Sequence, residues 1–494
     1  MSLGKKVTHA VSWLAVAQVA QRATTLVVTA ILARKLLPAD FGLIALTLLS
    51  VNFISYFQDM GLSSALVQRA ELEKQHLDTA FWVNVAGGLM LGVIGLALSP
   101  VLAVFFREPR LTRLLMVMMI TLPINGLGWA SYALLQRRLA FKQIAIIEWV
   151  NVSVSGVAAI ALAISGIGVW ALVAQNIVGS LIIAGGRLAA ADWFPGLSFS
   201  RKRFRELFSF SSGALGYFLV NHVMRNVDKM IIGGVLGATA LGFYSIAYNL
   251  ILMPGMTICG LVGRVMFPAL SSVQTDLSRF RRAYLRMART VAFATFPMIV
   301  GLGATARIFV PTIYGDRWLP SIPILQILIV IGFFEAIAIW GAAAWALGNT
   351  RMSVICAVIS LVMMTASFAV GVNWGLTGVA WAYVIASPII FLVPHIWTNR
   401  LMDLRLGSLL EAIAPPLCAA SVMGLSVWWL INDGVRLFTA SWANLIAYVA
   451  LGAAIYALVL LSMAFVYRRQ HSVISWLIGR HLADIDVHAQ GISF

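Results

Sequence analysis

Between Phe208 and Asn249 the sequence interrupts a long apolar stretch with a cluster of polar and charged side chains. Four of them fall at positions i, i+4, i+7 and i+8 and would share one face of a helix: Asn221, Arg225, Asp228 and Lys229. An ionisable side chain in hydrocarbon costs roughly 2.5–3.5 kcal/mol on insertion scales, so such groups usually face a bundle interior or a water-filled cavity. The spacing therefore predicts a cavity with a basic, polar lining. A simpler alternative is an ion pair between Asp228 and Lys229 near the membrane surface.

Polar stripes also occur in other apolar stretches. Gln18 and Arg22 lie one helical turn apart in the first stretch, and Asn52 and Asp59 share a face in the second. Side chains that suit sugar hydroxyls are Gln18, Asn52, Asn221, His222, Asn226 and Asn249. Ion coupling or charge balance is expected of Asp59, Glu148, Asp228, Arg264 and Glu335. Each carboxylate can instead simply neutralise an arginine, and Arg264 is near enough to the end of its stretch to snorkel to the surface.

The cations in this pattern suit an anionic ligand. Arginine offers a planar, permanently charged group that holds phosphate oxygens in pairs, and lysine adds a point charge. We expect Arg22, Arg225 and Lys229 to supply these contacts. The sequence contains no GxxxxGKS/T phosphate loop, no HExxH and no histidine cluster, and its three cysteines have unrelated spacing. No catalytic residue, metal or cofactor is therefore expected.

Membrane-spanning helices must position these side chains. The chain has 494 residues, of which 61% are hydrophobic and 11% charged, and its mean hydropathy is +0.92. Apolar stretches of about twenty residues recur from end to end and predict about fourteen transmembrane helices. These stretches do not alternate with period two, as the strands of a membrane barrel would. The predicted fold class is an all-α polytopic membrane protein.

The net charge of +17 follows the membrane topology. Lys and Arg concentrate in alternate loops, as the positive-inside rule requires, so both termini are expected in the cytoplasm. This distribution argues against a nucleic-acid partner. The densest basic clusters, in Arg201–Arg205 and Arg279–Arg289, are expected to attract anionic membrane lipids.

The first half of the sequence is repeated in the second. Leu36–Gly42 aligns with Leu236–Gly242, and two further matches follow in the same order: Gly168–Ala171 with Gly378–Trp381, and Arg137–Leu139 with Thr350–Met352. Two six-helix units in parallel orientation are therefore expected, with a cavity between them. The predicted parts are a first lobe over 1–195, a second lobe over 206–400, two additional helices over 406–468 and a cytoplasmic tail over 469–494.

Four stretches of this sequence resemble a known family. They are Phe57–Arg69 (FQDMGLSSALVQR), Asn226–Gly233 (NVDKMIIG), Leu241–Asn249 (LGFYSIAYN), and Tyr314–Trp318 followed by Ile322–Gln326. They are similar to bacterial polysaccharide transporters of the multidrug/oligosaccharidyl-lipid/polysaccharide exporter superfamily, most of all to colanic-acid and xanthan type exporters. The similarity extends from about Ser2 to the last predicted helix.

The resemblance implies a flippase in the bacterial inner membrane. Its expected substrate is an undecaprenyl-pyrophosphate-linked oligosaccharide, moved to the periplasmic leaflet by alternating access of two lobes. Arg22 and Arg225 would then hold the pyrophosphate, with Lys229 as a weaker third contact. A polysaccharide polymerase and export machinery are further candidate partners.

Two other functions remain open at this point. A multidrug exporter of the same superfamily would be expected to have an acidic cavity for cationic drugs, whereas the stripes here are more basic than acidic. A membrane glycosyltransferase or polysaccharide polymerase would need catalytic groups, and the short external loops leave little room for a catalytic domain.

Overall fold

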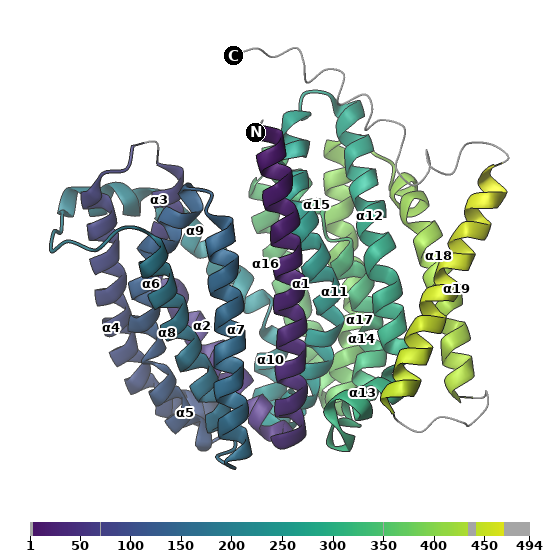
Figure 1. Cartoon of the computed structure of the whole chain (residues 1–494), viewed down its shortest axis with the longest axis horizontal. Coiled ribbons are helices and arrows are strands. Elements are labelled where there is room, and N and C mark those ends of the chain that lie inside the picture. Colours follow the sequence, from purple (N-terminus) through teal and green to yellow (C-terminus); the bar gives the residue numbers. More distant parts are fainter. Residues whose placement is uncertain (1–2, 70, 349, 433–440, 469–494) are drawn as a thin grey trace.

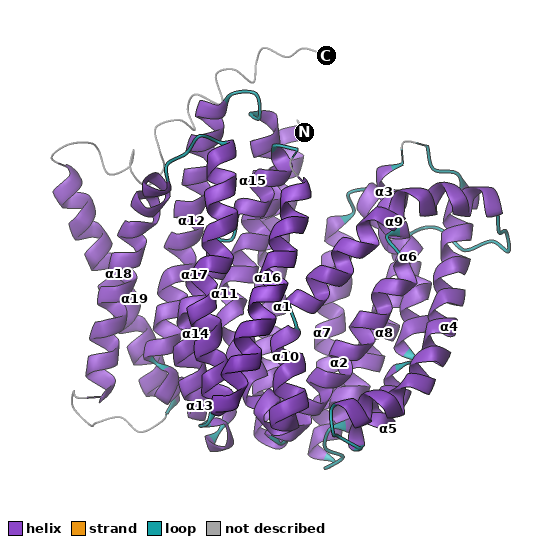
Figure 2. Ribbon diagram, turned by 180° about the vertical axis from the view of Figure 1, so that it is seen from behind, coloured by secondary structure: helices purple, strands orange, loops and turns teal. Residues whose placement is uncertain are grey.

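The computed structural model of the chain describes residues 3–69, 71–348, 350–432 and 441–468. Within these ranges it describes side chains except at 3–16, 209–218, 261, 263–269, 271–272, 350–351, 353 and 466–468. Every regular element in the described ranges is a helix (Figure 2). Eleven described segments are long and apolar enough to cross a membrane. The prediction of an all-α polytopic membrane protein is confirmed at this level, and the tail over 469–494 lies outside the described residues.

The first part of the chain forms eight helices. They are α1 (Leu3–Lys35), α2 (Pro38–Asp59), α3 (Leu62–Gln68), α4 (Lys74–Phe105), α5 (Arg110–Met118), α6 (Thr121–Arg137), α7 (Phe141–Ile164) and α8 (Trp170–Ala190). Helix α2 begins at Pro38, because proline has no N–H to leave unbonded in a first turn and its φ already suits a helix. It ends where Met60 and Gly61 adopt positive φ values of 47° and 79°.

The second part contains eleven more described α-helices and three short irregular ones. They are α9 (Arg201–Met224), α10 (Val227–Ile231), η1 (Ile232–Leu236), α11 (Gly237–Ser272), α12 (Leu277–Ala304), α13 (Ala306–Tyr314), η2 (Asp316–Trp318), α14 (Ser321–Ala336), α15 (Trp340–Ala346), α16 (Thr350–Gly371), η3 (Val372–Trp374), α17 (Gly375–Leu401), α18 (Leu406–Asn432) and α19 (Trp442–Arg468).

The helices gather in two groups (Figure 1). Helices α2 to α8 form one group, and α11 to α19 form the other, with α18 and α19 packed together at its outer edge. Helix α1 lies between the groups, where it packs along α7 and also touches α11 and α13. The ribbons of the two groups diverge toward the end where the N-terminus lies and converge at the end marked by α13 (Figure 1). At the converging end α2 packs against α11.

At the diverging end, ion pairs hold the start of α9 against the first group. Arg69 lies 2.7 Å from Glu206, and Arg203 lies 2.7 Å from Glu73. The preceding segment is bound to α4, because Asp78 accepts hydrogen bonds from the Gly196 backbone N–H (3.0 Å) and the Ser198 hydroxyl (2.7 Å). The first turns of α9 thus pack with α3 and α4 although the sequence repeat assigns them to the second half.

Candidate functional site

The polar stretch between α9 and α11 does not form one continuous helix. Helix α9 ends at Met224, and Asn226 has φ −133° and ψ 5°, outside the helical region. Helix α10 then runs for only five residues before the π-helical η1 begins. Side chains at helical spacing nevertheless line common cavities across this break. Of the four residues on the predicted polar face, Lys229 lines one cavity. The other three, Asn221, Arg225 and Asp228, line another together.

The first of these, the central cavity, has a volume of about 600 Å³. Helices from both halves of the sequence line it. The first half contributes Asn52, Ser55, Tyr56, Asp59, Ser64 and Trp129, and the second half contributes His222, Asn226, Lys229, Ser245 and Asn249. The polar groups of this lining are one ammonium, one carboxylate, one imidazole, three carboxamides, several hydroxyls and an indole. Such a set offers both hydrogen-bond donors and acceptors, together with an aromatic surface.

Hydrogen bonds orient the two charged groups of the central cavity. The Lys229 ammonium donates to the Asn226 side-chain oxygen over 3.0 Å and lies 5.7 Å from the centre of the Tyr248 ring. Asp59 Oδ1 accepts from the Ser63 backbone N–H (3.2 Å) and hydroxyl (2.6 Å), so it also stabilises the first turn of α3. Neither charge is neutralised by the other.

His222 connects the two halves beside the same cavity. Its ring lies 5.0 Å from that of Tyr56 and 5.9 Å from that of Phe53, both on α2. The side chain is buried, and its Nε2 atom has no hydrogen-bond partner among the described residues. His222 therefore acts in this state as a packing residue, with one ring nitrogen still able to bond a ligand or water.

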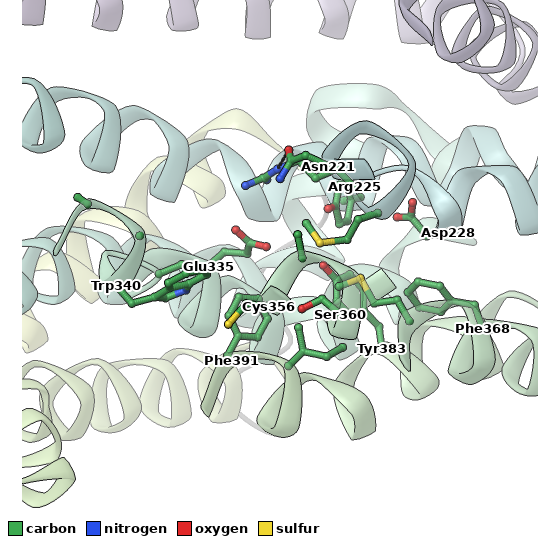
Figure 3. Close-up of a pocket in the computed structure, with 18 of the residues that line it drawn as sticks. Asn221, Arg225, Asp228, Glu335, Trp340, Cys356, Ser360, Phe368, Tyr383 and Phe391 are labelled. Carbon is green, nitrogen blue, oxygen red and sulfur yellow. Dashed lines mark hydrogen bonds between the residues drawn. The ribbon is translucent and has the colours of Figure 1, made fainter. Parts of the chain in front are cut away.

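The second cavity, of about 490 Å³, lies within the second half of the chain (Figure 3). Its polar residues are Asn221, Arg225, Asp228, Glu335, Ser360 and Tyr383. Aromatic rings make up much of the rest of the wall: Tyr248, Trp340, Trp345, Phe368 and Phe391. Arg225 Nε donates to the Asn221 side-chain oxygen over 3.2 Å. Figure 3 shows the Glu335 carboxylate directed toward the side of the cavity where Asn221 and Arg225 lie.

A stack of buried tyrosines adjoins the second cavity, and two of them, Tyr248 and Tyr383, line it. The rings of Tyr244 and Tyr248 are 5.5 Å apart and nearly parallel, and Tyr383 stacks on Tyr248 at 6.3 Å. Tyr244 donates a 2.8 Å hydrogen bond to Asp228. Our sequence analysis did not assign these tyrosines to a site. The sequence feature that could have indicated them is the segment LGFYSIAYN, which places Tyr244 and Tyr248 one helical turn apart.

The other predicted site residues lie elsewhere. Gln18 and Arg22 on α1 line neither cavity, so the structure does not bring Arg22 and Arg225 together around one space. Glu148 on α7 interacts electrostatically with Arg187 of α8. Arg264 belongs to α11, but its side chain lies outside the described residues. Among the described residues, no group of three His, Cys, Asp or Glu side chains could hold a metal ion.

Comparison with known proteins decides the family. A model of a family described as "Polysaccharide biosynthesis protein" matches residues 31–323, more than half of the chain. The chain belongs to this polysaccharide biosynthesis protein family. A similar protein, the teichuronic acid biosynthesis protein TuaB of Bacillus subtilis (strain 168), is 30% identical over 394 residues, which are 78% of this chain and 80% of TuaB. The succinoglycan biosynthesis transport protein ExoT of Rhizobium meliloti (strain 1021) is 28% identical and covers 92% of this chain and 93% of ExoT.

Solved structures share the fold of this family member. The lipid II flippase MurJ in an inward closed conformation superposes with a TM-score of 0.73 at 16% identity, over 92% of this chain and 99% of MurJ. An inward-facing multidrug resistance transporter of the MATE family gives a TM-score of 0.60 at 17% identity, over 79% and 98%. At these identities the likeness concerns the fold alone. The family membership makes the chain a membrane transporter of polysaccharide biosynthesis and not an enzyme.

Proposed function

We propose that this protein flips undecaprenyl-pyrophosphate-linked oligosaccharide repeat units across the bacterial inner membrane for exopolysaccharide synthesis. The observation that carries the proposal is the central cavity, because both halves of the sequence line it and its lining is polar within a membrane protein. A flippase needs such a space, since a sugar headgroup cannot cross hydrocarbon without partners for its hydroxyls. The relative ExoT, named as a succinoglycan biosynthesis transport protein, supports the substrate class.

The cavity lining suggests a division of roles. Lys229 supplies positive charge for the pyrophosphate from within the central cavity. Asn52, Asn226 and Asn249 hydrogen-bond sugar hydroxyls, and the Trp129 indole offers a flat face to a sugar ring. Arg225 and Arg22 act in another state of the alternating-access cycle. The break beside Arg225 supports a change of orientation there, because the regular backbone hydrogen-bond pattern is interrupted at Asn226.

We further propose that the membrane arrangement is fourteen spans with two six-helix lobes, two additional helices and cytoplasmic termini. The segment Val354–Leu401 among the eleven candidate spans contains both α16 and α17. Helices α1 and α9, with 33 and 24 residues, are each long enough to add one more. The partners of this protein in the proposed pathway are membrane lipids, a polysaccharide polymerase and export machinery.

Multidrug export is the second candidate function, and the second cavity favours it. Aromatic rings together with the carboxylates of Asp228 and Glu335 would suit an amphipathic organic cation. Arg225 in the same wall opposes this assignment, as does the family match. An organic cation that competes with lipid-linked oligosaccharide for transport would support multidrug export.

The test is transport by the purified protein in proteoliposomes that contain a fluorescent lipid-linked oligosaccharide. Wild-type protein should move the lipid between leaflets. Lys229→Gln should slow this movement at least about tenfold, because it removes one charge-assisted contact with the pyrophosphate. Lys74→Gln is the matched control, because Lys74 is exposed at the start of α4 and lines neither cavity. Equal rates for wild type and Lys229→Gln would overturn the role of the central cavity, and absence of flipping by wild type would overturn the function.

A further inference from the structure

We propose that Gly42 of α2 and Gly242 of α11 form a latch that shuts one end of the central cavity and parts when that end opens. This proposal depends on the proposed function in one respect: a transporter must open this end of the cavity during its cycle. The two helices pack closely, and their first turns meet at Gly42 and Gly242.

The crossing is tight enough to exclude any side chain at either glycine. A Cβ atom on Gly42 would lie 1.7 Å from the Ala238 carbonyl oxygen, and one on Gly242 would lie 2.0 Å from the Pro38 carbonyl oxygen. Both obstacles are backbone atoms, so no change of side-chain rotamer can relieve the overlap. In this state only glycine is compatible with either position.

The contact is reciprocal. Gly42 lies four residues after Pro38, and Gly242 lies four residues after Ala238, so each glycine meets the carbonyl that precedes the other glycine by one helical turn. The sequence repeat aligns Leu36–Gly42 with Leu236–Gly242. The same element of the two repeats therefore contacts itself across the boundary between the halves.

The latch lies directly beside the central cavity. Ala45 and Ser245, each three residues after a latch glycine, both line that cavity. Because three residues are nearly one turn, the crossing closes the space immediately below these side chains. Any separation of α2 from α11 at the glycines would therefore open the cavity toward this end.

Trp318 reinforces the latch from the second half of the chain. Its side chain is fully buried, and its indole N–H donates a 2.9 Å hydrogen bond to the Ala33 carbonyl at the end of α1. The ring meets Phe41 edge-on at 5.2 Å and Phe243 at 5.9 Å, and these are the residues next to the two latch glycines.

Arg34 adds a second connection across the halves, because its Nε donates to the Ile313 carbonyl over 3.0 Å. At the other end of the molecule, the ion pair of Arg203 with Glu73 holds the start of α9 against the first group and does not join the two groups. The close backbone contact between α2 and α11 lies at the converging end, near the first turn of each helix.

A methyl group at either glycine should act on one state alone. It clashes with a backbone carbonyl while the latch is closed, but meets no such obstacle once α2 and α11 separate. Within a helix, alanine is intrinsically favoured over glycine, so the substitution should not prevent folding. A change that disfavours one state and spares the other shifts the population toward the open latch.

The experiment measures how fast a cysteine in the central cavity reacts with a membrane-impermeant maleimide. Ala45→Cys is the reporter, in a protein whose three native cysteines are replaced by alanine. The reagent is added to intact cells from outside and, separately, to inside-out vesicles. Gly42→Ala and Gly242→Ala should each raise the rate of labelling from the latch side about tenfold or more. A modest shift of the population toward the open state produces a change of this size.

Gly260→Ala is the matched control on α11, because a Cβ there would meet nothing within 4 Å. Unchanged labelling in both latch variants relative to this control would overturn the proposal. Should either glycine variant be produced poorly, Trp318→Phe tests the same latch by removing the hydrogen bond to Ala33, and it should raise labelling in the same direction. Labelling does not require substrate, so the two proposals can fail separately. If the latch variants show increased labelling but the wild-type protein does not flip the lipid, the proposed substrate is rejected and the latch is still supported.

Discussion

Tyr244 donates a 2.8 Å hydrogen bond to Asp228, and both side chains are buried. The bond joins the short helix α10 to α11. Asp228 also accepts from the backbone N–H of Lys229 over 2.8 Å. With Asp228 held in this way on the side of the second cavity, its sequence neighbour Lys229 faces the central cavity. Asp228 and Lys229, adjacent residues of opposite charge, therefore line two different cavities.

Removing this bond should destabilise the protein. Tyr244→Phe leaves a buried carboxylate short of one donor, and we expect a loss of about 1–3 kcal/mol in unfolding free energy. The measurement is thermal or denaturant unfolding in detergent. Tyr284→Phe is the control, because that tyrosine is equally buried but its hydroxyl has no partner among the described residues. If the two variants unfold alike, the Tyr244 bond does not stabilise α10.

Arg225 should be more important for transport than for stability. Its side chain is exposed to the second cavity, so Arg225→Gln should fold as well as wild type while transport falls sharply. Arg225→Lys should be only partly active, since lysine lacks the paired donors of the guanidinium group. Yield, melting and flipping in proteoliposomes measure the three effects.

The structural alternative for Arg225 predicts a different pattern. If Arg225 chiefly neutralises Glu335, its loss leaves a buried carboxylate unpaired and should cost about 3–5 kcal/mol. Arg225→Gln combined with Glu335→Gln would then recover both stability and transport. Such recovery of transport would reject a role for Arg225 as a ligand group.

Asp59 is a better candidate for ion coupling than Glu148. Asp59 lines the central cavity, whereas Glu148 lines neither cavity and interacts with Arg187. If a proton drives transport through Asp59, Asp59→Asn should abolish the dependence of the transport rate on external pH, and Glu148→Gln should preserve it. Ser63→Ala separates coupling from helix capping, because it removes the 2.6 Å hydrogen bond to Asp59 but keeps the carboxylate. Normal pH dependence in Asp59→Asn would leave Asp59 with a structural role.

The proposed topology can be tested with reporter enzymes that are active only in the periplasm. A fusion after Phe494 should be silent. The turn Gly237–Leu241 is also predicted to be periplasmic, but it adjoins the tight crossing of α2 and α11 and is a poor insertion site. The loop at Gly166–Gly168 between α7 and α8 is better, because both glycines have open space around them, and a reporter there should be active. The opposite pattern would reverse the topology.

Part of the fold followed directly from the sequence. Apolar stretches of bilayer length determine an all-helical membrane protein, because only helices satisfy their own backbone groups in lipid without a closed barrel. Helix α2 begins at Pro38, inside the repeated segment Leu36–Gly42. The repeat of Leu36–Gly42 at Leu236–Gly242 identified two segments that contact each other, although the sequence could not show that their glycines touch.

Tertiary structure alone decided which polar side chains share a space. Asn221, Arg225 and Asp228 line one cavity, although the helix breaks at Arg225 and Asn226 without a proline or glycine. Lys229 was predicted on the same face but lines the central cavity. Beyond the break, Lys229 joins Trp129 and Asn249, residues far from it in sequence, in one cavity. Periodicity shows which face of a helix is polar, whereas the packing of neighbouring helices determines which cavity, if any, that face meets.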